Sequence, residues 1–115
     1  MTWEQVVALG LKLPEAAESV WYGTPALKGR AQSFVRLKEN GKDVVSLLAS
    51  VDEQEHLIEA APEIYYITDH YRGWPAVLAR LAKLKPAECR RRLEAGWRLK
   101  APKTLVRKYE QAVAT

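Results

Sequence analysis

The residues best suited to chemistry lie in one short segment that mixes aromatic rings with hydrogen-bond donors. Tyr66, His70, Tyr71 and Trp74 all fall between residues 66 and 74. Aromatic faces interleaved with donors suit base stacking, a small ligand or a protein partner. The alternative is that these rings cap the core where sheet and helices meet, as aromatic side chains commonly do in small domains.

Basic side chains form the second candidate site. Residues 72–115 carry twelve basic residues against three acidic ones, while residues 1–71 carry six against eleven, so a net charge of +4 hides a strong asymmetry. Such a field attracts polyanions, although a charged run is also the ordinary solvated face of a helix. The expected phosphate contacts are Arg30, Arg36, Arg72, Arg91, Arg98, Lys100, Lys103 and Arg107.

No residue pattern in the sequence indicates a catalytic, metal-binding or cofactor-binding site. One cysteine and two histidines cannot supply the usual zinc ligands, and the scattered glycines match no phosphate-binding loop. Cys89 is predicted on the buried side of a helix, where a thiol behaves as a small hydrophobic group. An enzyme would need His70 to meet a second ionisable group in a cleft. The sequence therefore predicts a protein that is not an enzyme and uses no metal or cofactor.

Composition indicates one ordinary globular domain over residues 1–115. The chain is 48% hydrophobic and 28% charged, which is typical of a folded domain rather than a disordered one. No stretch approaches the apolar length of a membrane span, and no export signal is present. The single cysteine excludes an intrachain disulfide and favours a reducing cytoplasm.

The elements that must position these side chains follow from periodicity and turn residues. Thr2 and Gln5 form a capping-box pattern that starts a helix over residues 2–12. Strands are predicted over residues 20–22, 26–28, 33–38, 43–49, 64–68 and 76–81. Asn40-Gly41 predicts a hairpin closed by a type I′ turn. Asp52 and Glu55 form another capping pattern, which predicts a helix from Asp52 to about Ala61.

Two further helices are predicted at the C-terminal end. Pro86 suits the first turn of a helix that continues through Leu99, with Cys89, Leu93 and Trp97 facing inward. Pro102 interrupts it, and a final short helix is marked by Leu105, Val106, Tyr109 and Val113. Helices and strands do not alternate, so the pattern predicts an α+β fold in which N-terminal, middle and C-terminal helices pack an antiparallel sheet.

Several blocks of the chain occur in the order typical of one family. Trp21–Lys28, Tyr66–Leu78, Trp97–Arg98 and Ala101–Lys103 resemble the MmcQ/YjbR family. The resemblance implies a compact α+β domain of double-wing type, and the family is commonly labelled DNA-binding. A basic residue usual shortly before the aromatic of the third strand is Gln32 here, which weakens the expectation of a phosphate contact at that point.

The leading hypothesis is a DNA-binding domain that meets phosphates through its basic C-terminal helices. The alternative is a protein-interaction or small-ligand module that uses the aromatic loop 66–74.

Overall fold

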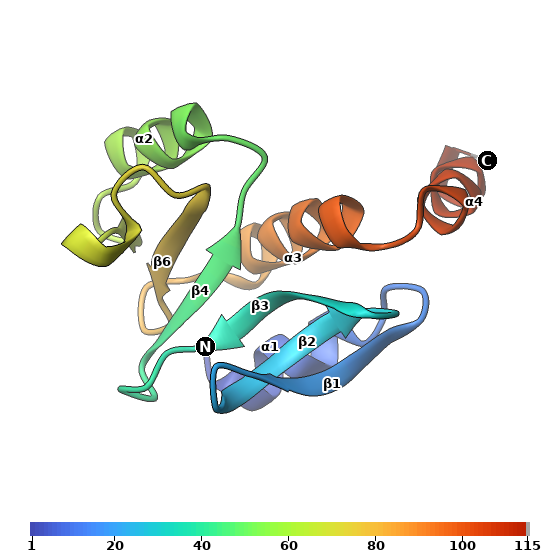
Figure 1. Ribbon diagram of the computed structural model, residues 1–115, viewed down its shortest axis with the longest axis horizontal. Coiled ribbons are helices and arrows are strands. Elements are labelled where there is room, and N and C mark those ends of the chain that lie inside the picture. Colours follow the sequence, from blue (N-terminus) through green and yellow to red (C-terminus); the bar gives the residue numbers. More distant parts are fainter. Residues whose placement is uncertain (115) are drawn as a thin grey trace.

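The computed structural model describes residues 1–114, which form an α+β domain around a six-stranded antiparallel sheet (Figure 1). The strands lie in the order β1-β2-β3-β4-β6-β5. The elements are α1 (Trp3–Gly10), β1 (Ala16–Trp21), β2 (Thr24–Gly29), β3 (Gln32–Leu37), β4 (Asp43–Leu47), α2 (Val51–Ala60), β5 (Tyr65–Tyr66), η1 (Asp69–Tyr71, a 3₁₀ turn), β6 (Ala76–Arg80), α3 (Pro86–Lys100) and α4 (Lys103–Ala114).

One face of the sheet carries the main core. The strand register aligns Leu37, Val44, Ala79 and Tyr65 in a row across β3, β4, β6 and β5. Val44, Ala79 and Tyr65 belong to the main hydrophobic cluster, and Leu37 packs against it. Val6 of α1 and the inward side of α3 belong to the same cluster. Since side chains alternate along a strand, the adjacent row must point to the opposite face.

That second row runs across the whole sheet and is chemically mixed. The register places Ser19, Ala26, Arg36, Val45, Leu78 and Tyr66 side by side on consecutive strands. Val45 and Leu78 form a separate small cluster with Ala76, partly covered by Tyr71. This face therefore has a thin apolar cover at one end and a charged residue, Arg36, at its centre.

The helix signals are largely confirmed. Thr2 and Gln5 form the predicted capping box of α1, Pro86 begins α3, and Cys89, Leu93 and Trp97 are buried. The prediction of Asp52 as the N-cap of α2 is wrong. Ser50 is its N-cap and accepts a hydrogen bond from the Glu53 N–H at 3.2 Å, so Asp52 lies inside the first turn.

The predicted hairpin between β3 and β4 is confirmed, but its turn is not of type I′. Gly41 has φ +70°, whereas Asn40 is absent from the positive-φ residues of the described chain. The side-chain oxygen of Asn40 instead accepts the N–H groups of Lys42 and Asp43 at 2.9 and 3.2 Å. Such a side-chain turn satisfies the loop backbone with Asn40 outside the left-handed region.

The other differences concern boundaries. The segment 64–68 contributes only the two-residue strand β5, and the loop that follows contains the 3₁₀ turn. The first hairpin turns at Tyr22 and Gly23, both at positive φ, so Thr24 and Pro25 belong to β2. No helix among residues 1–114 is long and apolar enough to cross a bilayer.

Candidate functional site

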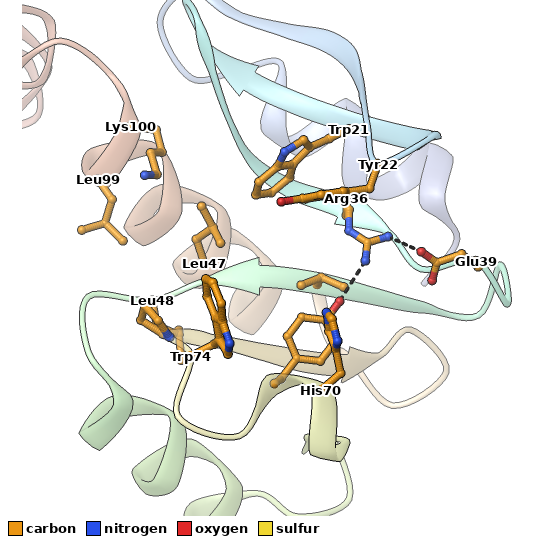
Figure 2. Close-up of a pocket in the computed structure, with 13 residues that line it drawn as sticks. Trp21, Tyr22, Arg36, Glu39, Leu47, Leu48, His70, Trp74, Leu99 and Lys100 are labelled. Carbon is orange, nitrogen blue, oxygen red and sulfur yellow. Dashed lines mark hydrogen bonds and ion pairs between the residues drawn. The ribbon is translucent and has the colours of Figure 1, made fainter.

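A groove of about 730 Å³ opens between the first hairpin and the aromatic loop (Figure 2). Figure 2 shows Trp21 and Tyr22 on one side, and His70 and Trp74 on the other, with Arg36 between them. The thirteen lining residues are Trp21, Tyr22, Arg36, Glu39, Val45, Leu47, Leu48, His70, Tyr71, Trp74, Pro75, Leu99 and Lys100. They come from segments far apart in the sequence, so only folding assembles the site.

The two walls expose large aromatic side chains to solvent. Tyr22 is 75% exposed and Trp74 is 66% exposed, which is unusual for rings of this size. The left-handed backbone at Tyr22 and Gly23, with φ of 52° and 78°, turns β1 back into β2 and leaves Tyr22 at the tip of the hairpin. Two exposed rings flanking one groove mark a binding surface more strongly than scattered apolar residues do.

Arg36 is the buried charge of the groove. The residue is 6% exposed, and its guanidinium donates to the Tyr71 hydroxyl at 2.8 Å, to the Glu39 carboxylate at 2.9 Å and to the Thr24 hydroxyl at 3.3 Å. Its Cζ also lies 5.5 Å from the centroid of the Tyr22 ring. The guanidinium therefore joins both walls of the groove to the sheet.

Glu39 balances this charge from the solvent side. Its side chain is 61% exposed, whereas that of Arg36 is 8% exposed. The pKa of Glu39 is lowered because its own backbone N–H and the Arg36 guanidinium stabilise the carboxylate. Glu39 is the one carboxylate among the thirteen lining residues, against Arg36 and Lys100.

The aromatic loop is held by a residue that the sequence analysis did not single out. Gln54 of α2 is 2% exposed, and its amide nitrogen donates to the carbonyl oxygens of Tyr71, Trp74 and Ala76 at 3.1, 2.8 and 2.7 Å. The carbonyls of Tyr71 and Trp74 also accept backbone N–H groups from within the loop, so the Gln54 amide adds a link from α2 to hydrogen bonds that the loop makes with itself. The signal for Gln54 in the sequence was a polar residue at a helix position that faces inward.

The four predicted aromatic-loop residues separate into two groups. His70, Tyr71 and Trp74 line the groove, and the rings of His70 and Tyr71 meet edge to face with centroids 4.9 Å apart. Tyr66 does not line it: its hydroxyl donates to the Asp43 carboxylate, and Arg80 lies 4.2 Å above its ring. Burial and the bond to Asp43 raise the pKa of Tyr66 to about 12.

Most of the eight predicted phosphate contacts are neutralised by nearby carboxylates. Arg30 pairs with Glu15, Arg36 with Glu39, Arg72 with Asp69, Arg91 with Glu88, and Arg98 with Glu94 and Glu110. Lys100, Lys103 and Arg107 make no ion pair within residues 1–114. Three of the eight predicted phosphate contacts therefore remain without an ion pair within the described residues, and they lie where α3 passes into α4.

The described residues contain no metal-ligand cluster and no activated thiol. No group of three or more His, Cys, Asp or Glu side chains in residues 1–114 is arranged to hold a metal ion. Cys89 is buried, and burial raises the pKa of its thiol to about 11, opposite to the activation of a nucleophile. Within the described chain, His70 makes no hydrogen bond to an ionisable side chain. The arrangement is suited to binding.

Comparison with known proteins gives a family but no assigned role. A model of the YjbR family matches residues 11–99. Uncharacterized proteins of Mycobacterium bovis and of two Mycobacterium tuberculosis strains are each 28% identical to this chain, over 94% of it and 95% of the relative. No solved structure is significantly similar. The matched residues include the whole groove lining except Lys100, whereas α4 lies outside them.

Proposed function

The chain belongs to the YjbR family, and from this premise and the shape of the groove we propose that it is a non-catalytic binding domain whose ligand occupies the groove. The observation that carries the proposal is the exposure of Tyr22 and Trp74 on opposite walls around the buried guanidinium of Arg36. A concave, mostly apolar site with a few convergent polar groups is the usual form of a small-molecule pocket.

The exposed rings supply a driving force for binding. An aromatic side chain that becomes fully covered removes roughly 150–250 Å² from water, at about 25 cal/mol per Å². Partial covering of Tyr22 and Trp74 by a flat ligand would contribute a few kcal/mol before the entropy of association is subtracted. Millimolar affinity requires about 4 kcal/mol after that subtraction, so the polar contacts of the groove must add to the apolar contribution.

The walls are also held in place without a ligand. Gln54 anchors the aromatic loop to α2, and the bond from Arg36 to Tyr71 ties the same loop to β3. Because these contacts order the loop during folding, little of the ordering cost falls on the binding step.

Titration of the ¹⁵N-labelled protein with a flat probe tests this proposal. The probes are 2-naphthamide, which is neutral, and 2-naphthoate, its anionic counterpart. We expect either probe to shift the amide signals of Tyr22, Leu47 and Trp74, and Trp74→Ala to weaken that binding. Val113→Ala removes an exposed apolar side chain from α4, outside the groove, and serves as the control. Shifts scattered over the surface, or no binding by either probe at millimolar concentration, would refute a groove ligand.

A second candidate function rests on the unpaired cations near the start of α4. Lys103 and Arg107 are one helical turn apart and exposed, Lys100 precedes them, and the first turn of α4 contains no acidic residue. Cationic side chains at this spacing can contact phosphates without reading base sequence. This observation supports nucleic-acid backbone binding by a surface smaller than the sequence predicted.

Fluorescence anisotropy of labelled single- and double-stranded oligonucleotides, measured across a salt series, tests the second candidate. Binding should weaken steeply with salt, and Lys103→Ala with Arg107→Ala should reduce both the affinity and the salt slope. The control is Arg72→Ala with Arg91→Ala, which removes two cations already paired with carboxylates. Equal loss of affinity in both double variants would show that the α4 cations are not a specific surface.

A further inference from the structure

We infer that the groove binds an organic anion with a planar ring, and that the carboxylate or phosphate of this ligand takes the place of Glu39 on Arg36. The inference rests on the proposed function, since it names the chemical class of the ligand for the same groove. It is carried by the geometry around one guanidinium.

Arg36 is arranged to hold a negative charge inside the groove. The residue is 94% buried, and an unpaired guanidinium at this depth would be costly, so it needs an anionic partner. Nη2 donates to the Tyr71 hydroxyl, and among the described residues its second N–H finds no acceptor. Nη1 is shared among Glu39, Thr24 and the Leu37 carbonyl. A carboxylate or phosphate could therefore accept one N–H from each nitrogen, which is the favoured geometry for a guanidinium.

Glu39 has the properties of an exchangeable partner. It lies in the loop between β3 and β4, three residues beyond Arg36, and its side chain is mostly in solvent. Because the Glu39 side chain is 61% exposed, water can solvate its carboxylate once it leaves Arg36. Displacing Glu39 therefore costs little, whereas the buried guanidinium still receives a negative partner.

The rest of the lining suits the planar part of such a ligand. Trp21 and Tyr22 form one wall, and Trp74 lies on the other (Figure 2). Val45 and Leu47 complete the lining between them with apolar surface. An anion without a ring would contact Arg36 but leave these rings exposed, and a neutral ring would leave Glu39 on Arg36. A ligand that carries both an anionic group and a planar ring would contact Arg36 and cover the exposed rings at the same time.

Two matched probe pairs, measured by isothermal titration calorimetry, test the anion requirement. The first pair is 2-naphthoate and 2-naphthamide, and the second is AMP and adenosine. We expect the anion of at least one pair to bind at least about tenfold more tightly than its neutral partner, the effect of one charge-assisted hydrogen-bond contact. Preference within the first pair alone identifies a carboxylate ligand, and preference within the second alone identifies a phosphate.

Variants of the two charged residues test the exchange itself. Glu39→Gln should raise the affinity for the preferred anion about threefold or more, because it weakens the resident competitor without disturbing the core. Glu55→Gln removes an exposed carboxylate of α2 outside the groove and should leave the affinity unchanged. Arg36→Gln should abolish the preference for the anion, and the Glu39 variant keeps the test valid if Arg36→Gln does not fold.

The outcomes separate this inference from the proposed function. Equal affinity for the charged and neutral members of both pairs would overturn the anion requirement and leave groove binding standing. Reduced anion affinity in Glu39→Gln would overturn the exchange. Failure of all four probes to bind would contradict both proposals.

Discussion

The Arg36 guanidinium donates to the Tyr71 hydroxyl at 2.8 Å, and this contact joins positions 35 residues apart in the sequence. It connects β3, at the centre of the sheet, to the 3₁₀ turn of the aromatic loop. The same guanidinium faces Glu39 and the Tyr22 ring. One contact thus fixes the position of the loop and the direction of the charge in the groove.

Tyr71→Phe should therefore loosen the loop while keeping its ring. The variant leaves one guanidinium N–H without its acceptor in a partly buried site, so we expect the free energy of unfolding to fall by about 1–2 kcal/mol. Urea denaturation followed by circular dichroism measures the change. Tyr22→Phe, which removes a hydroxyl that has no hydrogen bond within the described chain, should change stability little. Equal stability of Tyr71→Phe and wild type would mean that the bond is not maintained in solution.

Gln54→Leu should have a larger effect. The substitution keeps a side chain of similar size but removes the buried donor that three carbonyl oxygens share, of which those of Tyr71 and Trp74 keep a backbone donor, so we expect a loss of about 2 kcal/mol. Because those carbonyls belong to residues 71, 74 and 76, amide hydrogen exchange should accelerate in the aromatic loop before the core strands are affected. Gln32→Leu, at an exposed position of β3, is the control. Uniform acceleration across the sheet would contradict a local role for Gln54.

Trp74→Ala should separate binding from folding. The side chain is 66% exposed, so we expect stability to change by less than about 0.5 kcal/mol. Affinity for the preferred naphthyl probe should fall about tenfold, because one wall of the groove loses its ring. Thermal unfolding measures the stability of the variant, and calorimetric titration of the same preparation measures its affinity for the probe. A large loss of stability would instead assign Trp74 to the core.

Stability should decline under alkaline conditions. The pKa of Tyr66 rises from 10.0 to about 12 on folding because of burial and the bond to the Asp43 carboxylate. The folded state thus retains a proton that the unfolded state releases, so this contribution is complete below pH 10 and is lost as the pH rises towards 12. Tyr66→Phe should be less stable than wild type near neutral pH and lose less over this range. Urea unfolding at several pH values measures the free energy of unfolding of the variant and of wild type. An identical decline with pH in the two proteins would refute the assignment of this effect to Tyr66.

The local elements were predictable because their signals are local. The Thr2–Gln5 capping box, Pro86 at the start of α3 and the inward line of Cys89, Leu93 and Trp97 each depend on residues within a few positions of one another. The turn at Asn40 and Gly41 shows the limit of such signals. The hairpin was predictable, but the Asn40 side chain bonded to the backbone and changed the turn type.

The candidate site was predictable only in part. His70, Tyr71 and Trp74 were identified as a possible pocket, and they do line the groove. Tyr66 was grouped with them by its position in the sequence, yet it faces Asp43 and Arg80. The opposite wall of Trp21 and Tyr22 could not be inferred, and Gln54 was visible only as a polar residue on the inward side of a helix, because strand register and helix docking bring these residues to the groove.

The amino-acid sequence by itself determined the α+β class, the position of most helices and strands, and the family. Tertiary structure alone decided which of the arginines is buried in the groove. Arg36, Arg72, Arg91 and Arg98 each pair with a carboxylate three or four residues away in the sequence, but of these four only Arg36 becomes buried, beside two aromatic walls. The physical reason is that a local pattern records the sign of a charge and the carboxylates near it in the sequence, whereas its burial depends on residues distant in sequence that folding brings within a few ångströms.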